Sequence, residues 1–546
     1  MLTLGLLGGA VAGLLMAPAP PAGSAPPTGP TTTLMTTTTA TPAAGTSGWT
    51  VYHGSPSGSG VAASVTAVDT SARAWTSPQL SGQLYGQPLV VGGTVYVATE
   101  DDVVYALSST TGSVVWSTRL AQPVPSADLP CGDIQPTVGI TGTPVIDPGR
   151  GELFVLADEL VSGRPVHTLV GLDLTTGRTE LSEAVDPPGA TPAALLERTG
   201  LTLDDGRVVF GFGGNYGDCA SYRGRVVAVP ESGGTPLYFT VDAGPGESQG
   251  AVWMGGGAPA VDAAGNVWVE VGNGSVTSGS HAYDDSDSLL ELSSTLHLEQ
   301  YFAPSSWAAD NAADLDLSME PALLADGQVL VAGKSRIGYL LNGSHLGGIG
   351  GQEATATLPC RQDVDGGVAT AATTVYVPCV AGTMAVGVTA SPASLRVLWN
   401  SGRGGGPPVV AGGLVWTVGQ DGVLYGLDPA SGVVRRQATV GTPANHFPTP
   451  GVGAGLLLVT TADQVVAFAA PSGAPTSTTR PATTTVPPTS TGSTAPLVTP
   501  AVGSGGGGIP PGGIVAIVLG ALALLGAAVW GWRRRAHGAT HRPGGP

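Results

Sequence analysis

The sequence contains very few charged side chains and almost no lysine. Charged residues make up 11% of the 546 residues, against roughly 25% in an average soluble protein. Of the 21 basic residues, Lys334 is the only lysine and the others are arginines. Acidic residues number 39, which gives a formal net charge of −18. Because phosphate recognition requires clusters of Lys and Arg, we do not expect this chain to bind nucleic acid.

Several catalytic and metal-binding signatures are also missing. The eight histidines have no metal-ligand spacing, and no Gly-x-Ser-x-Gly element supports a serine hydrolase. The four cysteines form neither a C-x-x-C pair nor a haem-attaching C-x-x-C-H motif. In an exported protein we expect them to form disulfides. Several pairings are possible, and the short separation of Cys360 and Cys379 favours that pair, which leaves Cys131 with Cys219.

The two ends of the chain are predicted to export it and to anchor it in a membrane. Residues 2–16 are apolar and precede small residues, which is typical of a secretory signal peptide over 1–25, although no basic residue precedes them. Residues 514–532 are apolar and long enough to cross a membrane as a helix. Three arginines open the basic tail over 533–546, and the positive-inside rule places this tail in the cytoplasm. We therefore expect a single-pass membrane protein whose main domain lies outside the cytoplasm.

Linkers rich in Thr, Pro, Ala, Ser and Gly flank this domain. Residues 26–47 and 473–513 offer little apolar surface to bury, so both are expected to be extended spacers. The domain between them, over 48–472, has a composition that suits many short strands and tight turns, since the chain contains 85 Gly and 46 Pro. The use of arginine in place of lysine, together with the Ala, Gly, Pro and Thr bias, indicates a GC-rich bacterial genome.

The domain consists of a repeated unit. Residues 88–112 superimpose without gaps on residues 408–432: both begin with Pro, carry Gly-Gly at +4 and +5, carry Tyr at +17 and end in Thr/Ser-Gly. This pattern predicts four strands, joined by a Gly-Gly turn, an acidic turn and a Thr/Ser-Gly turn. Four strands of this kind form one blade of a propeller.

Weaker copies of the unit begin near positions 144, 206, 259, 321, 367 and 450. The last copy has only three strands. We expect residues 63–75 to supply its fourth strand, because pairing the first and last strands closes the ring and removes an exposed edge. The predicted fold is an all-β, eight-bladed propeller of four-stranded blades.

The unit resembles the repeat of the pyrroloquinoline-quinone (PQQ) propellers, whose blades end in Ala-Leu-Asp-x-x-Thr-Gly. The matching elements are Leu427-Asp428-Pro-Ala-Ser-Gly432 and Leu172-Asp173-Leu-Thr-Thr-Gly177. The resemblance covers residues 49–470. Non-catalytic scaffold propellers share this repeat, so the resemblance predicts a fold and leaves the activity open.

Residues 253–342 resemble the quinoprotein alcohol dehydrogenases more specifically. Asp314-Leu315-Asp316, followed by Pro321, is similar to their Trp-Asp-Tyr-Asp…Pro element, which implies that Asp314 is the catalytic base. The stretch from Gly333 to Leu341 is similar to Lys-Asn-Gly-x-x-Tyr-x-Leu-Asp, which implies that Lys334 contacts the quinone carbonyl.

The same resemblance implies a calcium ion beside the quinone. Asn273 would be a calcium ligand at the end of a Val-Gly-Asn stretch, and Glu159 would take the place of the calcium-binding glutamate. Asp314 would complete this oxygen-rich set, which is the chemistry that calcium prefers. Trp253 lies near the position of the tryptophan that forms the floor under the quinone.

The chain also departs from these dehydrogenases. They carry two adjacent cysteines over the quinone face, and this chain has no adjacent cysteines. Ala313 stands where the family motif has tryptophan, and the second blade has no evident clamp for the quinone carboxylates. Two functions therefore remain open. One is a PQQ- or ligand-binding propeller that oxidises alcohols or sugars. The other is a cofactor-free scaffold that recognises a surface or a protein partner.

Overall fold

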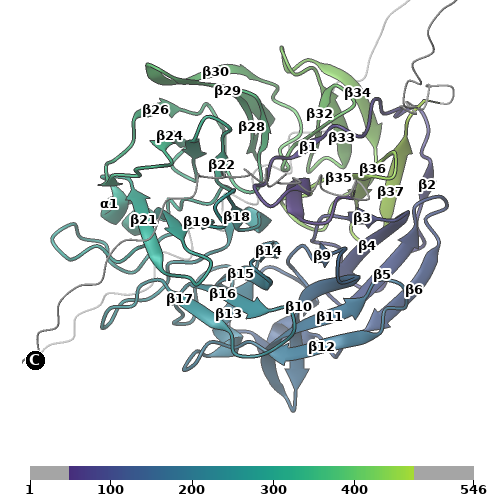
Figure 1. Cartoon of the computed structure of the whole chain (residues 1–546), viewed down its shortest axis with the longest axis horizontal. Coiled ribbons are helices and arrows are strands. Elements are labelled where there is room, and N and C mark those ends of the chain that lie inside the picture. Colours follow the sequence, from purple (N-terminus) through teal and green to yellow (C-terminus); the bar gives the residue numbers. More distant parts are fainter. Residues whose placement is uncertain (1–47, 381, 472–546) are drawn as a thin grey trace, which may run out of the picture. The chain divides into compact units, whose positions relative to one another are not determined.

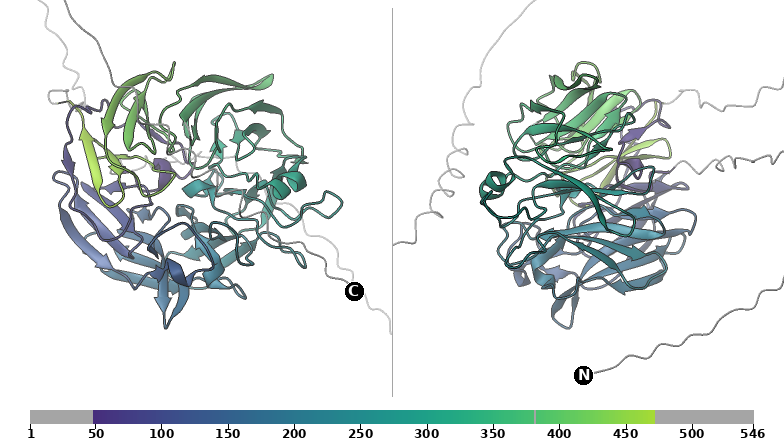
Figure 2. Two further views of the ribbon diagram at one scale, coloured as in Figure 1. Left: turned by 180° about the vertical axis from the view of Figure 1, so that it is seen from behind. Right: turned by 60° about the vertical axis from the view of Figure 1, so that its left-hand side comes forward.

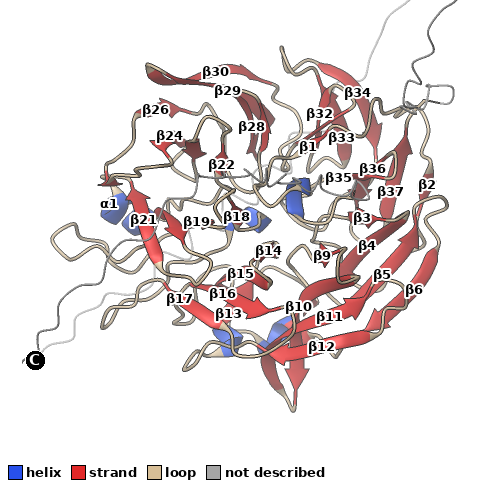
Figure 3. Cartoon of the chain, viewed as in Figure 1, coloured by secondary structure: helices blue, strands red, loops and turns tan. Residues whose placement is uncertain are grey.

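Short strands and tight turns make up nearly all of the described chain, and helices are few (Figure 3). The structure is a computed structural model, and it describes residues 48–380 and 382–471. Eight sheets of four or five strands follow one another around a ring (Figure 1). The view from behind in Figure 2 shows the same circular order. The predicted all-β, eight-bladed propeller is confirmed.

Each blade runs from a short strand near the middle of the ring to a strand at its periphery (Figure 1). The strands of the first four blades are β3 (Leu89–Val91), β4 (Thr94–Thr99), β5 (Val103–Ser108) and β6 (Val114–Arg119); β9 (Val145–Asp147), β10 (Glu152–Val161), β11 (Arg164–Asp173) and β12 (Thr179–Ala184); β13 (Leu195–Glu197), β14 (Thr202–Asp204), β15 (Arg207–Gly214), β16 (Arg225–Pro230) and β17 (Leu237–Thr240); and β18 (Ala260–Val261), β19 (Val267–Val271), β20 (Ser288–Leu292), β21 (Leu298–Ala303) and β25 (Gly348–Ile349).

The strands of the last four blades are β22 (Ala322–Leu323), β23 (Gln328–Val331), β24 (Ile337–Asn342) and β26 (Ala354–Thr357); β27 (Ala369–Ala371), β28 (Thr374–Cys379), β29 (Gly382–Ala390) and β30 (Ala393–Asn400); β1 (Val61–Ala62), β31 (Val409–Ala411), β32 (Leu414–Val418), β33 (Val423–Leu427) and β34 (Val434–Thr439); and β35 (Gly451–Gly453), β36 (Leu456–Thr460), β37 (Val465–Ala469) and β2 (Trp75–Thr76). The remaining elements belong to none of the eight blade sheets. They are a separate strand pair, β7 (Val124–Pro125) and β8 (Thr137–Val138), and the short helices η1 (Tyr52–Gly54), η2 (Ser126–Asp128), η3 (Pro192–Ala194), η4 (Met254–Gly256) and α1 (Trp307–Ala313).

Local sequence explains both the turns and the burial of the strands. Gly92 and Gly93 join β3 to β4 with φ values of 57° and 85°, and two positive φ values are what a tight hairpin turn of this kind requires. The middle strand β5 is almost entirely buried, because a neighbouring blade packs on each of its faces. The outer strand β30 alternates between partly buried and exposed residues, as expected for a strand with one solvated face.

The ring is closed by the strand pairing that the repeat count predicted. In the eighth blade, β2 pairs with β37 in antiparallel register, with Trp75 opposite Ala467. The strand itself covers only the C-terminal end of the predicted stretch 63–75. Upstream of it, the backbone N–H groups of Asp69 and Ala74 also donate to carbonyl oxygens of β37. The first and last parts of the domain are therefore joined within one sheet, which leaves no open seam in the ring.

Residues 48–68 form a segment that we call the strap, and its role was not predicted. Its backbone hydrogen-bonds to the innermost strands of five blades, the first, second, fourth, sixth and seventh. The residues that it pairs with there are Val90, Ile146, Val261, Thr370 and Val410. Within the seventh blade, β1 of the strap pairs with β31 in parallel register. These short inner strands would otherwise present unpaired backbone groups at the middle of the ring, which is costly when they are buried.

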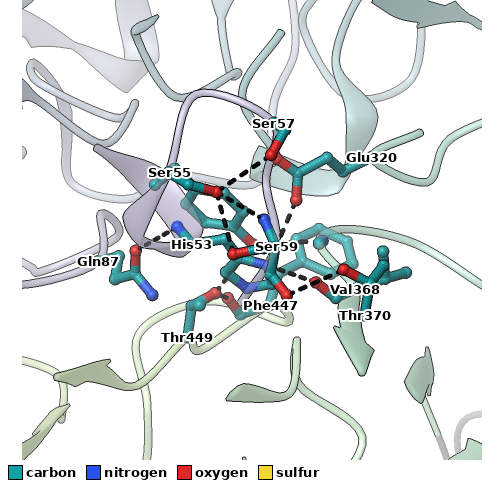
Figure 4. Close-up of polar contacts among 12 residues, drawn as sticks. His53, Ser55, Ser57, Ser59, Gln87, Glu320, Val368, Thr370, Phe447 and Thr449 are labelled. Carbon is teal, nitrogen blue, oxygen red and sulfur yellow. Dashed lines mark hydrogen bonds and ion pairs between the residues drawn. The ribbon is translucent and has the colours of Figure 1, made fainter. Parts of the chain in front are cut away.

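The strap buries the side chains of Tyr52 and His53, and Figure 4 shows His53 among Gln87, Glu320 and Val368. His53 lies 2.7 Å from the carbonyl oxygen of Val368 through Nδ1 and 3.4 Å from a Glu320 carboxylate oxygen. Burial lowers the pKa of His53 to about 3 and raises the pKa of Glu320 well above its ordinary value. The imidazole is therefore neutral at physiological pH, and its Nδ1–H donates to the Val368 carbonyl, which can only accept. The Tyr52 ring stacks on His53, with ring centroids 4.4 Å apart.

A second buried histidine lies within the second blade. His167 places Nδ1 2.6 Å from Asp186 and Nε2 3.4 Å from Asp158. Burial alone would lower the pKa of His167, but Asp158 and Asp186 outweigh this effect and raise the pKa to about 10. The imidazole is therefore charged at neutral pH and compensates two aspartates inside the blade.

Both predicted disulfides are present. Cys131 pairs with Cys219 and Cys360 pairs with Cys379, with Cα–Cα separations of 6.0 Å and 5.6 Å. The predicted signal peptide over 1–25, both linkers and the predicted membrane helix over 514–532 lie outside the described residues. Within 48–380 and 382–471, no helix has the length and apolar character needed to span a membrane.

Candidate functional site

The candidate site is formed by loop residues from several blades, which we call the central cluster. Its members come from the loops that precede β3, β18 and β35, from the loop between β13 and β14, from the loop between β23 and β24, and from the chain after α1. They are Tyr85, Arg198, Trp253, Asp314, Asp316, Lys334 and Phe447. These loops are far apart along the chain, so their side chains come together only when the ring has folded.

Lys334 lies between two carboxylates. Its Nζ is 2.9 Å from Oδ1 of Asp314 and 2.8 Å from Oδ2 of Asp316. Burial by itself would lower the pKa of Lys334, but the charges and hydrogen bonds of Asp316 and Asp314 outweigh it and raise the pKa above its ordinary value. The ammonium is therefore permanently charged. Lys334 and the Asp-Leu-Asp element, to which the resemblance gave separate roles, are in direct contact.

The two aspartates differ sharply in their surroundings. The Asp314 side chain is 69% exposed, whereas that of Asp316 is 5% exposed. Asp314 caps the C-terminal end of α1 in a left-handed conformation, which aspartate tolerates better than most residues. Asp316 accepts a second hydrogen bond through Oδ1 from the backbone N–H of Asn273, at 2.7 Å. The buried partner that holds Lys334 is thus Asp316, to which the sequence comparison assigned no role.

Asn273 joins the cluster through its main chain. Its backbone amide, and no side-chain atom, donates to Asp316. The preceding residue must be small, because a Cβ at Gly272 would lie 2.9 Å from Oδ1 of Asp316 and 3.3 Å from Nε1 of Trp253. The Val-Gly-Asn stretch therefore positions the Asp316 carboxylate.

Aromatic rings surround the two cations of the cluster. Lys334 Nζ lies 5.6 Å from the ring centroid of Trp253, within the range of a cation–π contact. The guanidinium carbon of Arg198 lies 5.5 Å from the centroid of Tyr85 and 5.4 Å from that of Phe447. Tyr85, Arg198, Trp253 and Phe447 are all partly exposed. In the described part of the chain, no hydrogen bond or ion pair of the Arg198 guanidinium is found, so its donors are available.

Glu159 does not join this cluster. It lies on β10 of the second blade, where its carboxylate accepts a hydrogen bond of 3.0 Å from the hydroxyl of Thr168. Burial raises its pKa. Its backbone forms a bridge with Pro123. None of these contacts involves Asn273 or Asp314, so the three ligands that the resemblance implied for calcium are not brought together.

The residues present do not fit the implied calcium ion. Asp314 and Asp316 already share one cation, the Lys334 ammonium, and Glu159 belongs to another blade. In the ring as described, no group of three or more His, Cys, Asp or Glu side chains is arranged to hold a metal ion. Arg198 instead offers unpaired donors beside the rings of Tyr85 and Phe447, and donors of this kind recognise anions.

Comparisons with known proteins agree with this fold. A PQQ-repeat family model, described as outer membrane protein assembly factor BamB, matches residues 39–278. The resemblance to the PQQ-repeat propellers is confirmed. The structure of quinohemoprotein alcohol dehydrogenase from Comamonas testosteroni is similar to this chain with a TM-score of 0.58 and 14% identity, over 77% of this chain and 80% of that one. No curated protein matches the sequence.

Two further solved structures are similar to this chain. A quinohemoprotein alcohol dehydrogenase from Pseudomonas putida HK5 has a TM-score of 0.56 and 13% identity, over 80% of this chain and 82% of that one. A europium-containing methanol dehydrogenase has a TM-score of 0.56 and 15% identity, over 77% of this chain and 98% of that one. Identities this low establish a common fold, and function has to be argued from the site.

Sequence reasoning missed three members of the central cluster, namely Tyr85, Arg198 and Phe447. Each lies in a loop of a different blade, and no local motif marks any of them. The sequence could have pointed to Asp316, since it is the second acidic residue of the Asp-Leu-Asp element. Only its burial distinguishes it from Asp314.

Proposed function

We propose that this PQQ-repeat propeller binds a planar, anionic small molecule, PQQ or a compound of the same chemistry, on its central cluster. The observation that carries the proposal is the Arg198 guanidinium, which lies between the rings of Tyr85 and Phe447 with no hydrogen bond to another described residue. Ligand carboxylates are recognised well by the planar fork of an arginine, and flat ring systems stack on aromatic faces.

The rest of the cluster supports the same ligand. Trp253 offers an indole face 6.0 Å from Phe447, measured between ring centroids. Lys334 adds a positive charge beside that face, although Asp314 and Asp316 neutralise most of it. We expect Arg198 to supply the main attraction and Lys334 to contribute less. Alcohol or sugar oxidation would need the bound quinone together with a base such as Asp314, which is exposed and within the same cluster.

The scattered calcium ligands favour a second candidate, a cofactor-free propeller that recognises a protein or surface partner. Glu159 is engaged with Thr168 in the second blade, and the Asp314 and Asp316 carboxylates are engaged with Lys334. In either case we propose that the protein is held at the cell membrane by the helix over 514–532, with the propeller outside the cytoplasm. Fractionation of cells that express the full chain, with protease accessibility from outside, tests this placement.

The decisive experiment is a titration of the full chain with PQQ, in the presence of calcium and in the presence of a chelator. Binding is followed by quenching of tryptophan fluorescence and by the rise in melting temperature that ligand binding produces. We expect saturable binding that does not require calcium and that is weakened about tenfold or more in Arg198→Gln. The matched control is Arg164→Gln, which removes the same charge at the exposed turn between β10 and β11.

The two candidates give different results in this titration. Saturable quenching that is lost in Arg198→Gln and kept in Arg164→Gln supports a ligand site at the central cluster, and dehydrogenase assays with an artificial electron acceptor then follow. Binding that requires calcium and that is equally strong in the wild type and in Arg198→Gln contradicts the assignment of the site. The absence of any saturable change leaves the scaffold function.

A further inference from the structure

The disulfide between Cys131 and Cys219 joins two loops at the surface of the ring. The first loop, residues 126–136, connects β7 to β8, and the second loop, residues 215–222, follows β15 of the third blade. Cys219 is exposed and Cys131 is half-buried. The bond therefore ties the connection between the first two blades to the third blade, across a sequence separation of 88.

A glycine leaves the two sulfur atoms of this bond uncovered. The φ of Gly217 is 98°, and a Cβ there would lie 3.6 Å from Sγ of Cys219 and 3.7 Å from Sγ of Cys131. The other disulfide is enclosed, since Cys360 and Cys379 are 5% and 1% exposed within a hydrophobic cluster. Because thiol–disulfide exchange requires a thiolate to reach a sulfur atom, a reductant has access to the first bond and not to the second.

Few hydrogen bonds fasten the two loops. In the described chain, no backbone N–H over 130–135 donates to a backbone carbonyl, and the N–H of Cys219 donates to Sγ of Cys131 at 3.2 Å. A cavity of about 10 Å³, close to the size that one water needs, separates both loops from Leu196. Segments with few hydrogen bonds and few apolar contacts open at a low free energy. The disulfide is therefore the main restraint on the first loop.

The first loop supports Tyr85 of the central cluster. Its residues Leu129 and Ile134 lie with the Tyr85 ring in one hydrophobic cluster, and we call these two side chains the wall. The guanidinium carbon of Arg198 lies 5.5 Å from the centroid of the same tyrosine ring. Tyr85 is thus held between the wall, which the disulfide fastens, and the cation of the central cluster.

We propose that Cys131–Cys219 is a site of thiol–disulfide exchange, at which a dithiol releases the wall behind Tyr85. A thiolate of the dithiol attacks the sulfur of Cys219, and the S–S bond breaks to leave Cys131 as a thiolate, which takes up a proton. The second thiol then displaces Cys219 from the mixed disulfide. The dithiol is oxidised to its own disulfide, and its two electrons and two protons pass to the two cysteines.

The first test is treatment of the native full chain with dithiothreitol, followed by alkylation of the new thiols with iodoacetamide and peptide mapping. We expect Cys131 and Cys219 to be alkylated about tenfold faster or more than Cys360 and Cys379, because enclosed sulfur atoms exchange only when the surrounding structure opens. Equal rates for the two disulfides, or earlier opening of the enclosed one, overturn the assignment of the exchange site.

The second test measures whether the open bond releases the first loop. Cys131→Ser combined with Cys219→Ser gives the open form. An endoproteinase that cleaves before aspartate should cut before Asp133 about tenfold faster or more in the open form than in the wild type. Cleavage before the exposed Asp326, in a turn of the fifth blade, should be unchanged. Equal cleavage before Asp133 in both proteins contradicts the proposal.

Two controls accompany this measurement. Wild-type protein reduced as in the first test should show the same faster cleavage before Asp133, which covers the case in which the substituted protein fails to fold. Cys360→Ser combined with Cys379→Ser removes the enclosed disulfide and should leave cleavage before Asp133 as in the wild type. Faster cleavage in this control, to the same extent as in the open form, would show general destabilisation and overturn the proposal.

Ligand binding gives a third readout, and this one alone rests on the proposed function. In the titration with PQQ, the open form should bind about threefold or more weakly than the wild type, because Tyr85 is no longer held in place before the ligand arrives. Equally strong binding by the two proteins contradicts the role of the wall. If the wild type binds no PQQ, the proposed function fails, and alkylation and proteolysis still decide whether the exchange site exists.

Discussion

Replacement of Lys334 by methionine tests whether Asp316 is a buried charge that depends on its partner. The variant Lys334→Met removes the ammonium and keeps the length of the side chain. Asp316 is 5% exposed and Asp314 is 69% exposed, so only Asp316 is left as an uncompensated buried charge. Breaking a buried ion pair from one side costs about 3–5 kcal/mol, whereas an exposed pair contributes about 0–1 kcal/mol.

The contacts of Asp316 narrow the range of the expected loss in stability. Asp316 retains the hydrogen bond from the Asn273 amide after the substitution, which leaves its carboxylate partly satisfied. We therefore expect Lys334→Met to lower the free energy of unfolding by about 3 kcal/mol, at the lower end of the range for buried pairs. Asp314→Asn should change it by less than about 1 kcal/mol, because that carboxylate is mostly in water.

The assay is urea denaturation of the full chain at neutral pH, followed by tryptophan fluorescence, for three single variants and one double variant. Asp316→Asn, combined with Lys334→Met, removes both buried charges, and we expect the double variant to be more stable than Lys334→Met alone. The reasoning is refuted if Lys334→Met costs less than about 1 kcal/mol, or if Asp314→Asn and Asp316→Asn have equal effects.

Three other predictions follow from the packing. The pKa of His167 is raised to about 10, so the stability that its charge contributes is fully present below the unfolded pKa of about 6.5 and is lost as the pH rises through about 10. The measurement is the difference in free energy of unfolding between the wild type and His167→Gln. A difference that stays constant from pH 6 to 11 would contradict this prediction. Tyr52→Phe removes the hydroxyl that accepts from the Gly367 amide, and it should cost about 1–2 kcal/mol in thermal or urea unfolding; no loss would show that the strap is loosely held. Replacing Cys360 and Cys379 together by serine opens a loop with a sequence separation of 19, and should cost about 3 kcal/mol in urea unfolding; reduction of the wild-type protein also opens the disulfide between Cys131 and Cys219, so a smaller loss on reduction than on substitution would contradict this.

Much of the fold could be predicted because the propeller is built from local, repeated pieces. The Gly-Gly turn at Gly92 and Gly93 and the Thr/Ser-Gly turns depend on backbone preferences of residues next to each other. A blade is one supersecondary unit, so counting copies of it leads to eight blades and to the closing strand in the eighth. The disulfide between Cys360 and Cys379 also followed from short separation along the chain.

The site was predictable only in part, because its residues come from loops that the sequence does not bring together. The sequence singled out Lys334 and the Asp-Leu-Asp element separately, and the fold brings them into contact on neighbouring segments of the fifth blade. The resemblance to dehydrogenases assigned roles to Asp314 and Glu159 by position in a motif. Burial instead makes Asp316 the residue that holds the lysine, and Glu159 is engaged within its own blade.

What the sequence alone determined about this protein is the kind of unit it repeats, how many times, and how the ring closes, because turn chemistry and strand periodicity are local properties. The tertiary structure decided what lies in the middle of the ring. The strap over 48–68 pairs with inner strands of five blades, and Arg198 meets Tyr85 and Phe447 from other blades. These contacts depend on which loops the closed ring turns inward, and on which carboxylates are then removed from water. Neither the choice of inward-facing loops nor the burial of these carboxylates is a property of any short stretch of the chain.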